Sequence, residues 1–99
     1  MCGAPDQDTL APLTPGSGET VVQGRVVKGG APLPGAYVRL LDGTGEFTAE
    51  VQTSATGQFR FFAADGEWTL RVLAPGQVVD SPVRATQGQV TETVVEVPS

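Results

Sequence analysis

The chain has 99 residues, of which 39% are hydrophobic and 17% are charged, with 13 glycines, 8 prolines and no histidine. This length supports one hydrophobic core, and the many turn-forming residues favour short strands over long helices. The formal net charge of −5 repels polyanions at long range, which argues against nucleic acid and anionic membranes as partners.

The first 18 residues differ in pattern from the rest of the chain. They contain three prolines and three glycines, and their apolar residues recur with neither the period of a strand nor that of a helix. We therefore predict an extended or disordered arm over residues 1–18, followed by a β-sandwich domain over residues 19–99.

From Glu19 onward, short β-rich runs are separated by turn residues at intervals of about 8 to 12 residues, which is typical of a sandwich or barrel. The pattern predicts an all-β fold with about seven strands in two sheets. The expected strands are 19–27, 36–42, 47–53, 58–63, 68–74, a weak strand at 78–83, and 90–97.

Two details of these strands carry specific expectations. The turn at residues 54–57 is expected to close a hairpin between the strands on either side of it. In the last strand Val90 and Val94 are out of phase with Val95 and Val97, so we expect a bulge near Thr93 and Val94.

Alternation within the strands predicts which side chains face the core. Phe47 is in phase with Ala49 and Val51 in the third strand. The inward set is expected to contain Val22, Val26, Val38, Leu40, Val51, Phe59, Phe61, Trp68, Leu70, Val72 and Val95.

Three segments carry a family resemblance: residues 24–40 (GRVVKGGAPLPGAYVRL), 53–61 (TSATGQFRF) and 65–72 (DGEWTLRV). They resemble carboxypeptidase-regulatory-like domains, a group of transthyretin-like β-sandwiches, and the likeness extends over residues 19–97. The resemblance implies the fold but no activity, because such modules serve as stalks, adhesion domains and accessory domains alike.

A second resemblance extends over nearly the whole chain. It is carried by the opening MCGAP and by the segments ETVVQGRV, YVRLLD, EFTAEV, SATGQFRFFAA and WTLR. These segments resemble a family of small uncharacterised actinobacterial proteins that are typically encoded beside a rhodanese-like thiosulfate sulfurtransferase. The resemblance implies a role in sulfur metabolism with a sulfurtransferase as partner, and it implies no catalytic residues.

Cys2 is the one cysteine of the chain and the one candidate nucleophile. Removal of the initiator methionine would place an α-ammonium beside its thiol, which favours the thiolate. Such a thiolate is a candidate acceptor of sulfane sulfur, which would make the protein a sulfur carrier. The alternatives are a terminal cysteine without function and the lipid-anchored cysteine of a surface module.

A candidate partner-binding face is formed by outward residues that share one phase on three strands. If those strands lie in one sheet, their arginines and apolar side chains have the composition of a protein interface. The alternative is ordinary cross-strand pairing of an arginine with Glu50 or Glu92. The candidate face contains Tyr37, Arg39, Arg60, Phe62 and Arg71, with Leu41 and Leu73 in the same phase.

No residue pattern predicts catalysis, a cofactor or a metal. Serines and threonines have no histidine partner for nucleophilic catalysis. The acidic residues, Asp42 and Asp80 among them, lack the spacing of a calcium loop and are interpreted as turn formers and solvating charge.

The sequence therefore predicts a non-enzymatic accessory or adaptor protein that binds a protein partner, with no cofactor. No targeting or spanning segment is evident, so a cytoplasmic location is expected. Two other functions stay open: a sulfur carrier acting through Cys2, and a surface-anchored structural module. The oligomeric state is not predicted.

Overall fold

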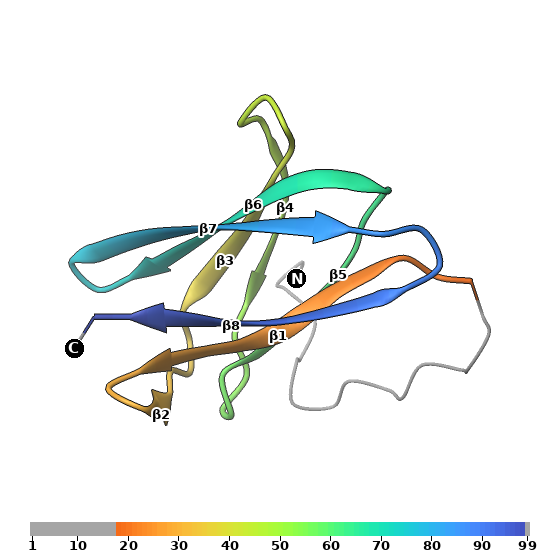
Figure 1. Cartoon of the computed structure of the whole chain (residues 1–99). Coiled ribbons are helices and arrows are strands. Elements are labelled where there is room, and N and C mark those ends of the chain that lie inside the picture. The colour runs from red at the N-terminus through yellow and green to blue at the C-terminus, as the bar shows by residue number, and fades with distance from the viewer. Residues whose placement is uncertain (1–17, 99) are drawn as a thin grey trace, which may run out of the picture.

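The alternating apolar segments form strands in a computed structural model that describes residues 18–98. Within that range there are eight strands and no helix (Figure 1). The strands are β1 (Val21–Lys28), β2 (Ala31–Pro32), β3 (Tyr37–Leu41), β4 (Phe47–Gln52), β5 (Gln58–Phe62), β6 (Gly66–Ala74), β7 (Gln77–Ala85) and β8 (Val90–Val97). Gly18 is the one residue of the predicted arm that is described. The rest of the arm, which includes Cys2, lies outside the described residues.

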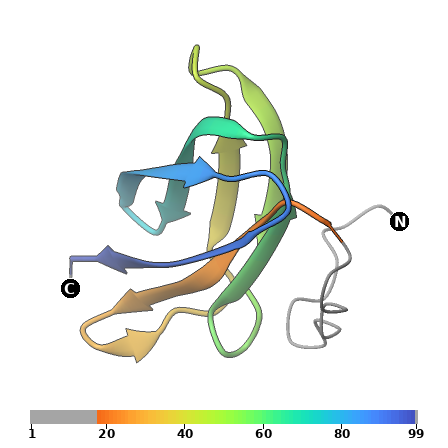
Figure 2. The same cartoon turned by 45° about the vertical axis from the view of Figure 1, so that its right-hand side comes forward.

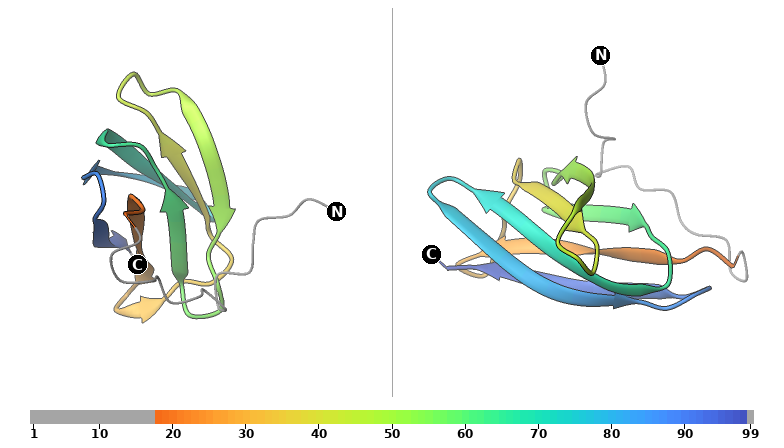
Figure 3. Two further views of the ribbon diagram at one scale, coloured as in Figure 1. Left: turned by 90° about the vertical axis from the view of Figure 1, so that its right-hand side faces the viewer. Right: turned by 90° about the horizontal axis from the view of Figure 1, so that it is seen from above.

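The strands form two four-stranded sheets. In sheet A, β1 lies between β8 and β5, and the two-residue β2 pairs with the end of β1. The β1–β8 pairing is parallel, and Figure 2 shows both strands running side by side in the same direction. Sheet B has the order β4-β3-β6-β7 with every pair antiparallel, and Figure 3 shows its long β6–β7 hairpin.

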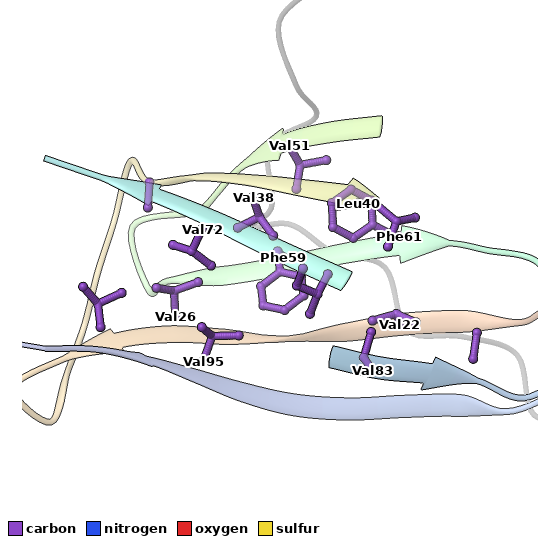
Figure 4. Close-up of a cluster of buried hydrophobic side chains, with 14 residues drawn as sticks. Val22, Val26, Val38, Leu40, Val51, Phe59, Phe61, Val72, Val83 and Val95 are labelled. Atoms are coloured by element: carbon purple, nitrogen blue, oxygen red, sulfur yellow. The ribbon is translucent and has the colours of Figure 1, made fainter. Parts of the chain in front are cut away.

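The core lies between the two sheets and confirms the predicted in-and-out alternation. Ten of the eleven residues predicted to face inward belong to it, with Phe59 and Phe61 among aliphatic side chains from both sheets (Figure 4). Trp68 is only partly buried at the edge of the core, and its indole Nε1–H donates to the Ala64 carbonyl oxygen over 2.8 Å. The all-β, two-sheet prediction is therefore confirmed.

The hairpin predicted across residues 54–57 is wrong. A tight turn does form there, with the Ser54 hydroxyl accepting the Gln58 backbone N–H over 3.0 Å. The two flanking strands nevertheless belong to different sheets, because β5 pairs with β1 and the Val26 N–H donates to the Gly57 carbonyl over 2.8 Å. The turn therefore carries the chain from sheet B to sheet A.

The bulge predicted near Thr93 and Val94 is also wrong, because β8 pairs with β1 in continuous register. Val90 and Val94 simply face outward, with 43% and 57% of their surface exposed.

The irregularity lies instead between Leu40 and Leu41, where β3 pairs with β4. Leu40 is opposite Ala49, whereas Leu41 is opposite Phe47, so β4 has one extra residue at this point. An extra residue reverses the alternation beyond it. Phe47 consequently faces outward with 60% of its surface exposed, although the sequence placed it in phase with Val51.

The weak strand predicted at residues 78–83 is in fact the nine-residue edge strand β7. Its Pro82 is tolerated because an edge strand leaves one side of its backbone without a ladder. Asp80, which was interpreted as a turn former, lies in the middle of this strand.

Among residues 18–98 there is no helix long and apolar enough to cross a membrane.

Candidate protein-binding face

The residues predicted to form one binding face are divided between two opposite surfaces. Tyr37 and Arg39 on β3 and Arg71 on β6 share the outer face of sheet B. Arg60 and Phe62 lie on β5, which belongs to sheet A. The predicted single patch required all three strands to lie in one sheet. This requirement is not met, because the chain crosses from sheet B to sheet A between β4 and β5.

A row of four charged residues crosses the middle of the outer face of sheet B. Strand register places Glu50, Arg39, Arg71 and Asp80 side by side on β4, β3, β6 and β7. The Arg39 Nε donates to the Glu50 Oε2 over 2.8 Å. Arg71 donates to both carboxylate oxygens of Asp80, over 2.9 and 3.0 Å. The cross-strand pairing of Arg39 with Glu50 that the sequence left as an alternative is therefore present.

The Arg71–Asp80 contact shifts the pKa of each group so that its ionised form is favoured. The hydrogen bond from Arg71 lowers the pKa of the Asp80 carboxyl, against a smaller opposing effect of burial. The same hydrogen bond raises the pKa of Arg71. Both groups therefore stay ionised at neutral pH, and the row carries two positive and two negative charges.

A largely apolar row lies on one side of the charged row. Gln52, Tyr37, Leu73 and Val78 occupy neighbouring positions on the four strands. Tyr37 is 46% exposed and Val78 is 61% exposed. The exposed surface of Tyr37 and Val78 is therefore available for contact.

A second apolar row lies on the other side and is set by the irregularity in β3–β4. Phe47 and Leu41 face each other across the strands, followed by Thr69 on β6 and Pro82 on β7. Leu41 is only 4% exposed. The Arg39 guanidinium carbon lies 5.9 Å from the centre of the Phe47 ring, within the range of a cation–π contact.

The outer face of sheet B therefore combines internally neutralised charges with exposed aromatic and aliphatic side chains. Tyr, Phe and Arg are enriched at protein interfaces. No group of three or more metal-ligating side chains lies within residues 18–98. The arrangement is suited to contact with another protein.

The candidate residues drawn from the sequence did not include Phe47, Val78 or Asp80, although all three belong to this face. The outward position of Phe47 results from the bulge, and the alternation of β4 does not reveal that bulge. Val78 and Asp80 became recognisable only through the pairing of β7 with β6, because the segment reads as a weak strand. The sequence alone does not show that Val78 lies opposite Leu73 and that Asp80 lies opposite Arg71.

The two-sheet arrangement recurs in solved structures, which share the fold at low sequence identity. The Bacillus anthracis TIE protein matches with a TM-score of 0.64 and 17% identity, over 79% of this chain and 17% of that one. The dioxygenase domain of a dioxygenase carbohydrate-binding protein fusion from Streptomyces sp. SirexAA-E matches with a TM-score of 0.65 and 14% identity, over 98% and 99% of the two chains. BcpA, the major pilin subunit of Bacillus cereus, matches with a TM-score of 0.57 and 16% identity, over 77% and 28%.

The two-sheet topology and these structural matches define an all-β sandwich protein. More specifically, the chain belongs to the family described as protein of unknown function DUF1416, whose model matches residues 2–97. Two uncharacterised proteins of Mycobacterium tuberculosis, Rv0814c and Rv3118, are each 48% identical over 98% of this chain and 99% of their own length. An uncharacterised protein of Mycolicibacterium smegmatis is 59% identical over 68% of this chain and 79% of its own. The expected membership of an uncharacterised actinobacterial family is confirmed.

Proposed function

We propose that this chain is a non-enzymatic accessory or adaptor protein that binds another protein through the outer face of sheet B. The observation that carries the proposal is the neutralised row of Arg39 and Arg71 with their carboxylates, placed between two rows of apolar side chains. A face whose charges are already paired within the chain can contact the apolar surface of a partner without leaving a charge unpaired.

The energy of such a contact would come from a few exposed apolar side chains. Tyr37, Phe47 and Val78 have 46%, 60% and 61% of their surface exposed. Burial of aromatic and aliphatic side chains against a partner is favourable in proportion to the area removed from water, and aromatic residues often dominate binding energy. Because the arginines are held by Glu50 and Asp80, they orient the contact more than they strengthen it.

The charge row favours a different protein over a second copy of this chain. Its signs read negative, positive, positive, negative from β4 to β7. This order is the same in both directions. Two copies stacked with their strands aligned would therefore bring like charges together in either orientation, which costs binding energy. A partner that presents apolar surface with hydrogen-bond acceptors fits better.

The first partner to test is a thiosulfate sulfurtransferase of the same organism. The support for this choice is the resemblance in sequence to small proteins encoded beside such enzymes. In this proposal the protein does no chemistry of its own and contributes to sulfur metabolism by binding the enzyme.

Isothermal titration calorimetry of the full-length protein against that sulfurtransferase tests the proposal. The wild type is expected to bind, and the double variant Phe47→Ser, Val78→Ser is expected to bind about tenfold more weakly. Both side chains are exposed, so the variant should keep its fold, which far-ultraviolet circular dichroism verifies.

The matched control is the double variant Phe62→Ser, Val90→Ser on sheet A. It removes a phenylalanine and a valine that are 60% and 43% exposed, and it should bind like the wild type. Absence of binding by the wild type would rule out this partner. Equal weakening by both double variants would rule out the outer face of sheet B. Self-association that Phe47→Ser abolishes would assign the face to a second copy instead.

A further inference from the structure

The outer face of sheet A, opposite the face described above, contains a hollow. It has a volume of about 410 Å³ and is lined by Gln23, Gly24, Arg25, Gln58, Phe59, Arg60 and Glu92. A second depression of about 240 Å³ adjoins it and extends over Thr93 and Val94 of β8. Together they form a trough that runs across β5, β1 and β8.

The side chains along this trough make it locally positive on an acidic protein. Arg60 Nε donates to the Gln23 Oε1 over 2.8 Å, and the Gln23 amide donates to the Glu92 Oε2 over 3.2 Å. The lining contains two arginines, Arg25 and Arg60, and one glutamate, Glu92, although the whole chain has a net charge of −5. An anionic group is attracted here and repelled by much of the remaining surface.

Arg25 is the group in the trough that lacks a counter-ion. Its side chain makes no hydrogen bond or ion pair with residues 18–98, in contrast to those of Arg39, Arg71 and Arg84. Register places Arg25 opposite Gln58 and Gln23 opposite Arg60, so the two arginines are diagonal neighbours on one face. Two guanidinium groups in this relation suit the planar, two-oxygen geometry of a carboxylate.

The shape of the trough indicates what kind of carboxylate it would take. Sites for small molecules usually enclose most of the ligand surface, whereas both hollows of this trough are partly open to solvent. Val94, which is 57% exposed, borders it and faces the same way as Arg25. An extended peptide with an acidic residue two positions from an apolar one, so that both side chains point the same way, matches the charge of the trough and its extension over β5, β1 and β8.

We propose that the outer face of sheet A binds an acidic peptide segment of a partner protein, with a carboxylate between Arg25 and Arg60 and an apolar side chain against Val94. This site is chemically distinct from the neutral, apolar face of sheet B and does not depend on it. Two unlike binding faces on opposite sides of one sandwich would allow the protein to bridge two partners.

Fluorescence anisotropy with the full-length protein tests this site. The probe is a fluorescein-labelled peptide in which aspartate and leucine alternate with one serine between neighbours, so that both types of side chain face the same way in an extended chain. The control probe replaces each aspartate by asparagine. The acidic peptide is expected to bind, and both the asparagine peptide and the Arg25→Gln variant should weaken binding by about tenfold.

The matched control variant is Arg84→Gln, which changes the net charge by the same amount. Arg84 lies on sheet B and pairs with Glu67 and Asp65, so its loss should leave the affinity unchanged. Equal binding of the two peptides would overturn the proposal, as would equal weakening by Arg25→Gln and Arg84→Gln.

Two further outcomes would assign the trough to another occupant and overturn the proposal. Tighter peptide binding by an Asp6→Asn, Asp8→Asn variant would show that the chain's own N-terminal carboxylates compete for the site. Self-association in sedimentation experiments that Arg25→Gln abolishes would show that a second copy occupies it. Unchanged affinity in the first case and a monomer in the second would support a separate partner.

Discussion

Arg39 and Arg71 lie directly opposite each other on β3 and β6, at the centre of the outer face of sheet B. Like charges in this relation destabilise a sheet. Each arginine is held from its other side by a carboxylate, Glu50 on β4 and Asp80 on β7. The four-residue row therefore holds two cations side by side with no net charge. The apolar side chains on either side of the row are then the groups that distinguish this face.

Removal of one carboxylate from this row should destabilise the sheet. Asp80→Asn leaves Arg71 opposite Arg39 without its own counter-ion, so the midpoint of thermal unfolding should fall slightly, because the pair is exposed and screened by solvent. Adding Arg71→Gln to Asp80→Asn removes the repulsion and should recover part of the loss. A midpoint that rises in Asp80→Asn, or a double variant less stable than the single one, would contradict this reading.

The stability of the protein should decrease at acid pH because of Asp42 and Asp80. Hydrogen bonds from the Thr44 side chain and the backbone lower the pKa of Asp42, which forms its turn as predicted, and the hydrogen bond from Arg71 lowers that of Asp80. The unfolded chain then binds protons more readily than the folded one. Their stabilising contribution is present above the usual carboxyl pKa of about 3.9 and is lost as pH falls through the lower folded values.

Urea unfolding at a series of pH values measures this dependence. The free energy of unfolding should fall as pH decreases below about 4. In the Asp42→Asn variant the fall should be shallower, since one of the two groups no longer titrates. An acid dependence that is the same in variant and wild type would show that Asp42 is not responsible.

Gly57 should not tolerate a side chain. Its φ is +76°, and a Cβ there would lie 2.6 Å from the Val26 carbonyl oxygen and 3.3 Å from the Pro32 Cβ. Gly57→Ala should lower the free energy of unfolding by about 2–4 kcal/mol, from left-handed backbone strain and the steric clash together.

The control for this change is Gly45→Ala. Gly45 has a φ of +86°, and apart from its two chain neighbours no residue within 18–98 has an atom within 4 Å of its would-be Cβ, so only the backbone cost of about 1–2 kcal/mol applies. Chemical denaturation of both variants gives the comparison. Equal losses would show that the contact with β1 does not constrain the crossing turn.

Thr53 should contribute to stability through its hydroxyl group. It is 5% exposed, accepts the Ala36 N–H over 2.9 Å and donates to the Leu33 carbonyl over 2.8 Å. Thr53→Val keeps the shape but leaves a buried donor and acceptor unpaired, which should cost about 1–3 kcal/mol. Thr48→Val, at an exposed position of β4, should be nearly neutral. Denaturation curves that coincide for the two variants would refute the role of the hydroxyl.

Local alternation was sufficient to predict the fold and most of the core. Phe59, Phe61 and Leu70 could be placed inward because the two-residue period depends only on sequence neighbours. The sheet to which β5 belongs depends instead on distant pairing, such as that of Phe61 with Val22. Nothing within residues 54–57 distinguishes a hairpin from a crossing between sheets.

The binding face was predicted only in part for the same reason. Tyr37, Arg39 and Arg71 share a phase that the sequence reveals, and the structure places them on one face. Arg60 was assigned to that face because phase alone does not identify a sheet. Phe47 was missed because a single extra residue in a ladder reverses the alternation beyond it. The position of that extra residue depends on packing between strands, which the local sequence does not show.

Nuclear magnetic resonance of the isotope-labelled full-length protein, titrated with the unlabelled sulfurtransferase, tests the account most directly because it maps the contact residue by residue. Backbone signals of Tyr37, Phe47 and Val78 are predicted to shift or broaden, while those of Phe62 and Val90 stay unchanged. Binding that leaves the first three signals unaltered would contradict the assignment of the outer face of sheet B as the partner-binding surface.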